Sequence, residues 1–191
     1  DDDHPYHPRP SLASPETADD PGRCLRQLVY YRIGEPAAPL PGRAVLVFDD
    51  GHWHEEITAG WIAKTAMRLH SRQLAVDIPL PQPLGRPYVC RVCDHRITPD
   101  RLHGHIDGLL TDLLETTRLL ELKAINHFSY QAALDGTPPI DYLTQMCLYL
   151  RGLQRLHPDI REGLLLIKNK NTAAYLEYRF TYDPAGDRCL L

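Results

Sequence analysis

The chain has 191 residues, of which 43% are apolar and 24% are charged, and its formal net charge is −4. This length and composition predict one globular domain with a hydrophobic core. No run of residues approaches the roughly 20 consecutive apolar residues that a membrane span requires, which argues against a membrane protein.

The negative charge is concentrated at the start of the chain. Residues 1–20 hold six acids and only one base, so the rest of the chain is close to neutral. Because residues 1–22 are also rich in proline and have no apolar period, we expect a flexible leader, followed by a single domain at 23–191. An overall negative charge therefore does not exclude a nucleic-acid partner, since a basic groove can coexist with an acidic leader.

The first half of the predicted domain begins with helices. A short helix is expected at 24–33 and a proline-rich loop at 34–42. A second helix is expected from about residue 51, because apolar residues recur at helical spacing over 54–69 and give it one buried face: Ile57, Trp61, Ile62, Ala66 and Leu69.

The second half of the predicted domain begins with strands, followed by a third helix and then by two more strands. The polar tetrad 115–118 suits a hairpin turn between two strands. A breaker cluster at 135–139 precedes a third helix, in which Ile140, Leu143, Leu150 and Leu153 follow the 3.6-residue period before Pro158 ends it. Strands are expected at 73–79, 87–93, 103–114, 119–125, 163–168 and 173–180.

The strongest chemical signal is Asp107 followed by Glu121, Leu122 and Lys123. Side chains alternate along a strand, so Glu121 and Lys123 should share a face while Leu122 points into the core. Pairing through the predicted turn would carry Asp107 towards that face. The apolar neighbours indicate buried strands, and buried carboxylates are costly unless they are paired or bind a metal. Mg²⁺ and Mn²⁺ prefer oxygen ligands, so Asp107, Glu121 and the carbonyl of Leu122 form a candidate site.

Asp107 with Glu121-Leu122-Lys123 resembles the signature of the PD-(D/E)XK nucleases. Two flanking motifs resemble the branch of RecB-type nucleases, CRISPR-associated adaptation nucleases and phage exonucleases. Upstream, the segment 51–55 resembles that branch's first motif and makes His54 the candidate metal ligand, although His52 is an alternative. Downstream, Gln145 and Tyr149 match its Q-x-x-x-Y motif, one helical turn apart on the same face.

The resemblance implies an α/β (α+β) fold with a restriction-endonuclease-like core, in which helices flank a central mixed β-sheet. It also implies a DNA nuclease that hydrolyses phosphodiester bonds with Mg²⁺ or Mn²⁺ and a catalytic lysine, Lys123. Gln145 and Tyr149 would face the active site and the substrate strand. By the same resemblance we expect an exonuclease acting on single strands or duplex ends in a bacterial or phage-infected cell. Phage recombination or DNA repair, with a homo-oligomer or a helicase as partner, is the implied setting.

Other interpretations of the motifs stay open. A restriction-type endonuclease could use the same core, and a nuclease-derived DNA-binding module could lack turnover. Lys168 and Lys170 end an apolar strand, where they either contact a DNA phosphate or project into water.

The cysteines support a further alternative. Only Cys90 and Cys93 are close in sequence, so a disulfide framework is not expected and a reducing cytoplasm is favoured. These two residues form half of a zinc pattern. An iron–sulfur cluster, as in several RecB-type relatives, would use Cys24 and Cys189, but only one cysteine lies near the C-terminus, so neither zinc nor a cluster is the leading expectation.

Overall fold

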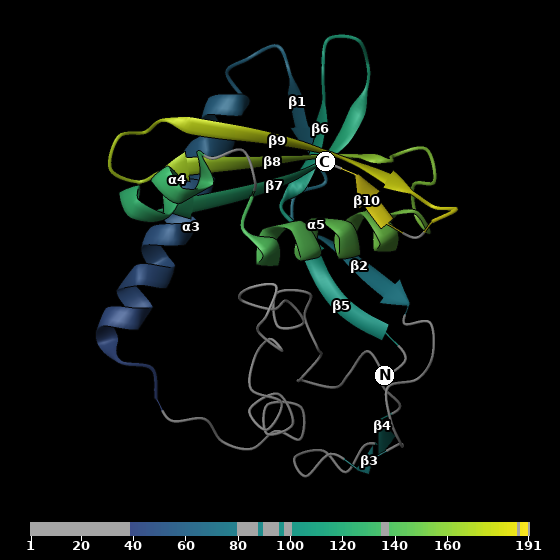
Figure 1. The fold of residues 1–191 in the computed structure, drawn as a ribbon, viewed down its shortest axis with the longest axis horizontal. Helices are drawn as coiled ribbons and strands as arrows, with labels where there is room; N and C mark the ends of the chain where they lie inside the picture. Colours follow the sequence, from purple (N-terminus) through teal and green to yellow (C-terminus); the bar gives the residue numbers. More distant parts are fainter. Residues whose placement is uncertain are drawn as a thin grey trace.

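The computed structural model describes residues 39–79, 88–89, 96–97, 101–134, 138–186 and 188–190. Its central element is a mixed six-stranded sheet with helices on both faces (Figure 1). In chain order the elements are α3 (Gly42–Ile62), β1 (Arg68–His70), β2 (Leu74–Pro79), β3 (Tyr88–Val89), β4 (Arg96–Ile97), β5 (Arg101–Ile106), β6 (Gly108–Thr111), β7 (Thr117–Ile125), α4 (His127–Ala133), α5 (Ile140–Leu153), β8 (Glu162–Asn169), β9 (Tyr175–Asp183) and β10 (Arg188–Leu190).

The strand order in the large sheet is β1-β6-β7-β8-β9-β10. Strands β7 and β8 are parallel, and the other neighbouring pairs are antiparallel. A parallel pair needs a long crossover connection, and here α4 and α5 form it. Two further pairs, β2 with β5 and β3 with β4, form separate two-stranded sheets. The expected α/β (α+β) class with a central mixed sheet is confirmed.

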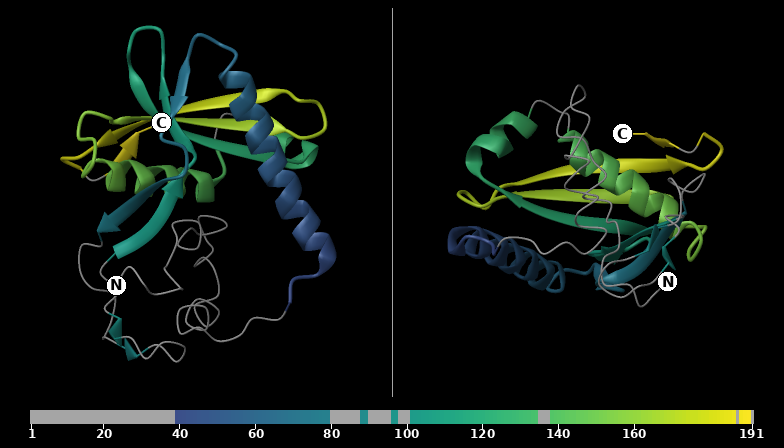
Figure 2. Two further views of the ribbon diagram at one scale, coloured as in Figure 1. Left: turned by 180° about the vertical axis from the view of Figure 1, so that it is seen from behind. Right: turned by 90° about the horizontal axis from the view of Figure 1, so that it is seen from below.

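The two faces of the sheet carry two hydrophobic clusters. Helix α3 covers the smaller cluster, where Ile62 packs against Leu120, Leu122 and Leu164. Helix α5 lies over the other face, and Figure 2 shows α3 and α5 on opposite sides of the sheet. Ile78 of β2 and Ile106 of β5 belong to the main core beside α5. There Met146 and Leu150 pack with Leu165 and Ile167 in the main core. Alternate residues of β7 therefore point to opposite helices, and Glu121 lies on the α5 side.

Helix α3 differs from the sequence expectation at both ends. It begins at Gly42 rather than near residue 51, and it ends at Ile62 rather than at 69. Gly51 lies inside the helix, where an added Cβ would meet nothing within 4 Å, so it costs some helix propensity but does not end the helix. Leu69 was assigned to the helix, but it pairs with Leu110 on β6, and this sheet pairing takes residues 68–70 into β1.

The hairpin and helix α5 agree with expectation. Strands β6 and β7 pair antiparallel, although the turn lies slightly earlier than predicted, where the Asp112 carboxylate accepts hydrogen bonds from the backbone of Leu114 and Thr116. Helix α5 spans Ile140–Leu153. It lies close to β8, because a Cβ added at Gly163 would come within 2.6 Å of Met146 Cε. This close packing fixes the helix face that carries Gln145 above β7.

Strands β1 and β10 and the short helix α4 were not predicted from the sequence. The expected helix at 24–33 lies outside the described residues. None of the helices in the described ranges combines the length and apolarity needed to cross a membrane.

Candidate active site

The predicted catalytic residues meet at one cavity, which we call the acidic cavity. It lies where β5, β6 and β7 meet α3 and α5, and its wall includes the carboxylates of Glu55, Asp107 and Glu121 together with Lys123, Gln145 and Tyr149. Asp107 occupies the bend between β5 and β6. The β6–β7 register pairs Gly108 with Leu120, so the next residue out on each strand places Asp107 opposite Glu121.

Two carboxyl groups are buried in the acidic cavity. Asp107 Oδ2 accepts a hydrogen bond from the backbone N–H of Leu122 at 2.7 Å, and burial raises the pKa of Asp107. Glu121 is only 1% exposed, and its Oε2 atom has no hydrogen-bond partner among the described residues. Burial raises the pKa of Glu121 to about 7, opposed by Lys123 and assisted by Asp107 and Glu55. Glu121 is therefore more basic than an ordinary carboxylate, because its negative charge is only partly compensated.

Lys123 compensates part of this charge. Its Nζ atom lies 2.5 Å from Glu121 Oε1, and it also lies 5.7 Å from the centre of the Tyr142 ring. Burial lowers the pKa of Lys123, but the Glu121 and Asp107 carboxylates more than offset that effect, so the pKa is raised overall. Lys123 therefore stays protonated at neutral pH and acts as a fixed positive charge.

Helix α5 contributes two polar side chains to the wall of the acidic cavity. Gln145 Nε2 donates to Glu121 Oε1 at 2.9 Å and to the Tyr149 hydroxyl at 3.2 Å. Burial is the main cause that raises the pKa of Tyr149 to about 12, so this hydroxyl stays protonated. Gln145 and Tyr149 thus lie on one helix face, as the helical spacing predicted, and Gln145 contacts Glu121 directly.

Helix α3 contributes a different residue from the one expected. Glu55 lines the acidic cavity, and its pKa is raised by burial and by the neighbouring Asp107 carboxylate. His54 is not in the wall of this cavity, and its Nε2 atom lies 3.6 Å from Asp50 Oδ1. Successive helical residues point about 100° apart, so His54 and Glu55 cannot share a direction. His52, three residues before Glu55, does line the acidic cavity.

In the sequence, Glu55 belongs to the segment 51–55 of the first motif, and no role was predicted for it. The signal that could have found it is the i, i+3 relation between His52 and Glu55, which puts both on one helix face. The direction in which that face points depends on how α3 docks on the sheet, and the motif does not contain that information.

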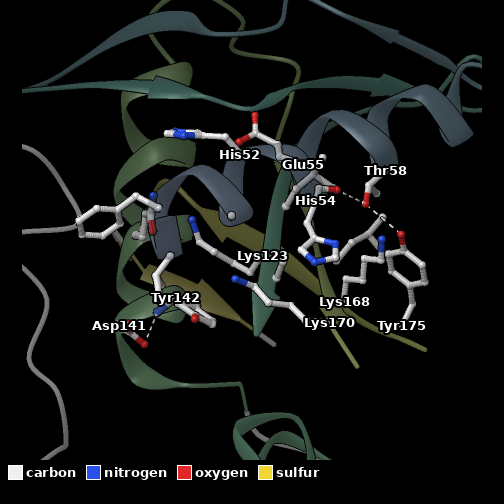
Figure 3. A pocket seen from close by; sticks show the side chains of 17 residues that line it. His52, His54, Glu55, Thr58, Lys123, Asp141, Tyr142, Lys168, Lys170 and Tyr175 are labelled. Carbon is white, nitrogen blue, oxygen red and sulfur yellow. Dashed lines mark hydrogen bonds between the residues drawn. The ribbon is translucent and has the colours of Figure 1, made fainter. Parts of the chain in front are cut away.

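A second depression adjoins the first, and we call it the basic cleft (Figure 3). It is lined by His54 and Thr58 of α3, Lys168 and Lys170 at the end of β8, and Tyr175 of β9. His52, Glu55, Lys123 and Gln145 line both the cleft and the acidic cavity. The two predicted DNA-binding lysines therefore lie next to the predicted catalytic residues.

The donor set of the acidic cavity suits a hard divalent cation. Carboxylate oxygens are the preferred ligands of Mg²⁺ and Mn²⁺, and the buried, unpartnered Oε2 of Glu121 offers one directly. Within the described ranges no three His, Cys, Asp or Glu side chains converge tightly enough to form a ready-made metal group. The three carboxylates line one cavity, and Lys123 is paired with Glu121.

The predicted cysteine ligands are not assembled by the described residues. Cys24, Cys90 and Cys93 lie outside these residues. Cys189 lies on β10, and its thiol hydrogen-bonds to Cys147 of α5, which lowers the pKa of the Cys147 thiol. Sequence reasoning did not connect these two cysteines.

Compared with known protein families and with curated proteins, the sequence matches none. A solved structure titled "Crystal structure of SSO0001" is similar with a TM-score of 0.42 and 14% sequence identity. The similarity covers 76% of this chain and 56% of that chain. The chain thus spans little more than half the length of this structural neighbour, and a likeness at this level carries no argument about function.

Proposed function

We propose that this protein is a divalent-metal-dependent nuclease that hydrolyses phosphodiester bonds in DNA. The observation that supports this most strongly is the surroundings of Glu121. This buried carboxylate has one oxygen without a partner in the described ranges, and it lies beside Asp107, Lys123 and Gln145 in a single cavity. A structural ion pair would use Glu121 and Lys123 alone and would not need two further carboxylates nearby, at Asp107 and Glu55.

Asp107, Glu121 and Glu55 would hold Mg²⁺ or Mn²⁺, with the Leu122 carbonyl as a further oxygen ligand from the sequence motif. Such an ion makes water more acidic and offsets the negative charge of a phosphodiester. Lys123, which is paired with Glu121 and lines both depressions, would present its ammonium to the substrate. There Lys123 would hold the scissile phosphate or orient the attacking water. Gln145 would keep Glu121 in place by its hydrogen bond to Oε1.

Exonuclease activity is the narrower form of the proposal, and it rests on the sequence resemblance alone. The alternatives are a restriction-type endonuclease and a DNA-binding module without turnover. The ion pair between Lys123 and Glu121 favours the module as the second candidate, because it occupies both groups that hydrolysis would need.

The test is digestion of end-labelled linear DNA and closed circular DNA with Mg²⁺, Mn²⁺ or EDTA. We expect metal-dependent loss of linear DNA that disappears in Glu121→Gln. Glu177→Gln, at a more exposed glutamate on β9, is the matched control and should cleave normally. Cutting of circles would identify an endonuclease. Binding without cutting would leave the DNA-binding module, and cutting by Glu121→Gln would refute the proposed site.

A further inference from the structure

The basic cleft contains one lysine whose charge is not neutralised. Lys168 is only 5% exposed, and its ammonium lies 4.4 Å from the centre of the Trp61 ring. Within the described part of the chain, it makes no hydrogen bond or ion pair. Desolvation lowers its pKa, as expected for a positive charge removed from water without a counter-ion. Such a costly arrangement of charge is typical of a site that a ligand completes.

The two other lysines that line the basic cleft are already paired. Lys170 Nζ lies 2.7 Å from Asp50 Oδ2, and Lys123 is paired with Glu121. Next to Lys168, the Nδ1 atom of His54 is also buried and has no partner in the described residues. An ammonium and an imidazole nitrogen therefore both lack a hydrogen-bond partner among the described residues of this cleft. An ammonium can only donate, so its partner must be an anion or a neutral acceptor.

The wall behind Lys168 is fixed by side-chain contacts. Thr58 Oγ1 donates to the backbone carbonyl of His54 at 2.8 Å, so the 2.9 Å contact between Thr58 Oγ1 and the Tyr175 hydroxyl has Tyr175 as its donor. Trp61 packs edge-on against Tyr175, with ring centres 6.5 Å apart. These contacts tie α3 to β9 and hold the indole that supports Lys168. The ammonium is thus positioned before any ligand arrives.

The cleft continues directly into the acidic cavity. Glu55 and Lys123 line both, so a nucleic-acid strand with one phosphate at the carboxylates would bring a neighbouring phosphate into the basic cleft. Exposed aromatic rings lie beside this path, with Trp61 46% and Phe48 57% exposed. Such rings commonly stack on the bases or sugars of a single strand.

We propose that Lys168 and the Nδ1 group of His54 form a binding site for a phosphate of the substrate strand other than the one that is cleaved. This inference rests on the proposed nuclease function and adds a second phosphate site to it. The phosphate is either terminal or internal to the strand, and these two sources share the same chemistry.

The test uses the full chain in EDTA, which prevents cleavage. Binding of a short fluorescein-labelled oligothymidine is measured by anisotropy at several salt concentrations. Lys168→Met should weaken binding about tenfold, as expected for a lost charge-assisted hydrogen bond, and should reduce the salt slope by about one phosphate contact. Lys168→Arg should retain most of the affinity. Lys64→Met, at an exposed lysine outside both depressions, is the matched control and should bind like the parent protein.

A site-specific signal comes from Trp61. The chain has two tryptophans, so Trp53→Phe leaves Trp61 as the only indole. Inorganic phosphate should change its emission, and the change should disappear when Lys168→Met is added. Oligonucleotides with a 5′-phosphate, a 3′-phosphate or no terminal phosphate then separate the two sources. If Lys168→Met loses affinity only for the oligonucleotide with one kind of terminal phosphate, the site binds that terminal phosphate. If it loses the same affinity for all three oligonucleotides, the site binds an internal phosphate.

Unchanged affinity and salt slope in a folded Lys168→Met variant would overturn the inference. That outcome is separate from failure of the nuclease proposal. A parent protein that cuts DNA while Lys168→Met binds normally would refute only the phosphate site. A parent protein that never cuts but loses affinity on Lys168→Met would refute only the nuclease.

Discussion

The acidic cavity and the basic cleft share strand β7 and helices α3 and α5, yet they balance their charges differently. In the acidic cavity, Lys123 and the Leu122 N–H compensate part of the buried negative charge, and one oxygen of Glu121 has no partner among the described residues. In the basic cleft, the Lys168 ammonium lies against the Trp61 ring and has no counter-ion in the described part of the chain. Two neighbouring sites on one sheet can therefore lack opposite charges. The acidic cavity lacks a cation, and the basic cleft lacks an anion.

The largest effect should come from removing a carboxylate of the acidic cavity. Asp107→Asn keeps the side-chain shape but removes a charge that the proposed ion needs, so we expect cleavage to fall at least about a thousandfold. DNA binding in EDTA should not weaken, since a negative charge has been removed. Rates of cleavage and anisotropy of labelled DNA measure the two properties, with the exposed Asp159→Asn as control. Cleavage within tenfold of the parent rate would mean that Asp107 has no catalytic part.

The assignment of α3 residues to the two sites can be tested directly. Glu55→Gln should weaken Mn²⁺ binding about 10- to 100-fold, by analogy with the loss of groups that support metal sites, whereas His54→Gln should change it less than twofold. Isothermal titration calorimetry with Mn²⁺ measures both. The reverse result, with His54 essential and Glu55 dispensable, would restore the ligand predicted from the sequence motif.

The uncompensated charge of Glu121 predicts a dependence of stability on pH. Burial raises its pKa from 4.5 to about 7. The folded state therefore binds this proton more tightly than the unfolded state, so folding is favoured below pH 4.5 and that advantage is lost as the pH rises to 7. For the metal-free protein we expect a decrease on the order of 1–3 kcal/mol across this range. Urea unfolding in EDTA measures it.

Two comparisons check the origin of that slope. Glu121→Gln should remove the part of the pH dependence of stability that comes from this carboxyl. Saturating Mg²⁺ should restore the stability that the parent protein loses at pH 7, since an ion that binds only the folded state stabilises it. A parent protein whose stability has the same pH slope as Glu121→Gln would show that this carboxyl has an ordinary pKa.

The smallest effect concerns the wall of the basic cleft. Tyr175→Phe removes the hydrogen bond to Thr58 and should cost about 1 kcal/mol of unfolding free energy. It should leave Mn²⁺ affinity in the acidic cavity unchanged. Urea denaturation and calorimetry measure these properties. If Tyr175→Phe reduced the free energy of Mn²⁺ binding by more than it reduced the free energy of unfolding, the two sites would be coupled through α3.

The features set by local patterns were predictable from the sequence. The period of apolar residues located α5, and strand alternation put Glu121 and Lys123 on one face. The start of α3 was missed because Gly51 resembles a breaker, although it lies in an exposed helical stretch that tolerates it. Its end was missed because Leu69 satisfies a helical period as well as a strand, and only pairing with Leu110 decides between them.

The site itself was predictable in its strand and α5 components and not in its α3 component. Asp107 and Glu121 belong to one hairpin, so their proximity follows from local pairing. The choice between His54 and Glu55 depends on the rotation of α3 about its own axis, which is set by packing of Ile62 against the sheet. The sequence also could not show that Lys168 lacks a counter-ion among the described residues, because that depends on which groups of α3 and β9 lie across from β8.

The parallel pairing of β7 with β8 has a consequence for the order of folding. The β6–β7 hairpin forms from residues close in sequence, so the Asp107–Glu121 pair can appear early, on the microsecond timescale of hairpins. The basic cleft requires β8, which reaches β7 only after the α4–α5 crossover has closed, and such non-local pairings form slowly. A newly made chain would therefore bring Asp107 and Glu121 together well before it completes the surface that contains Lys168.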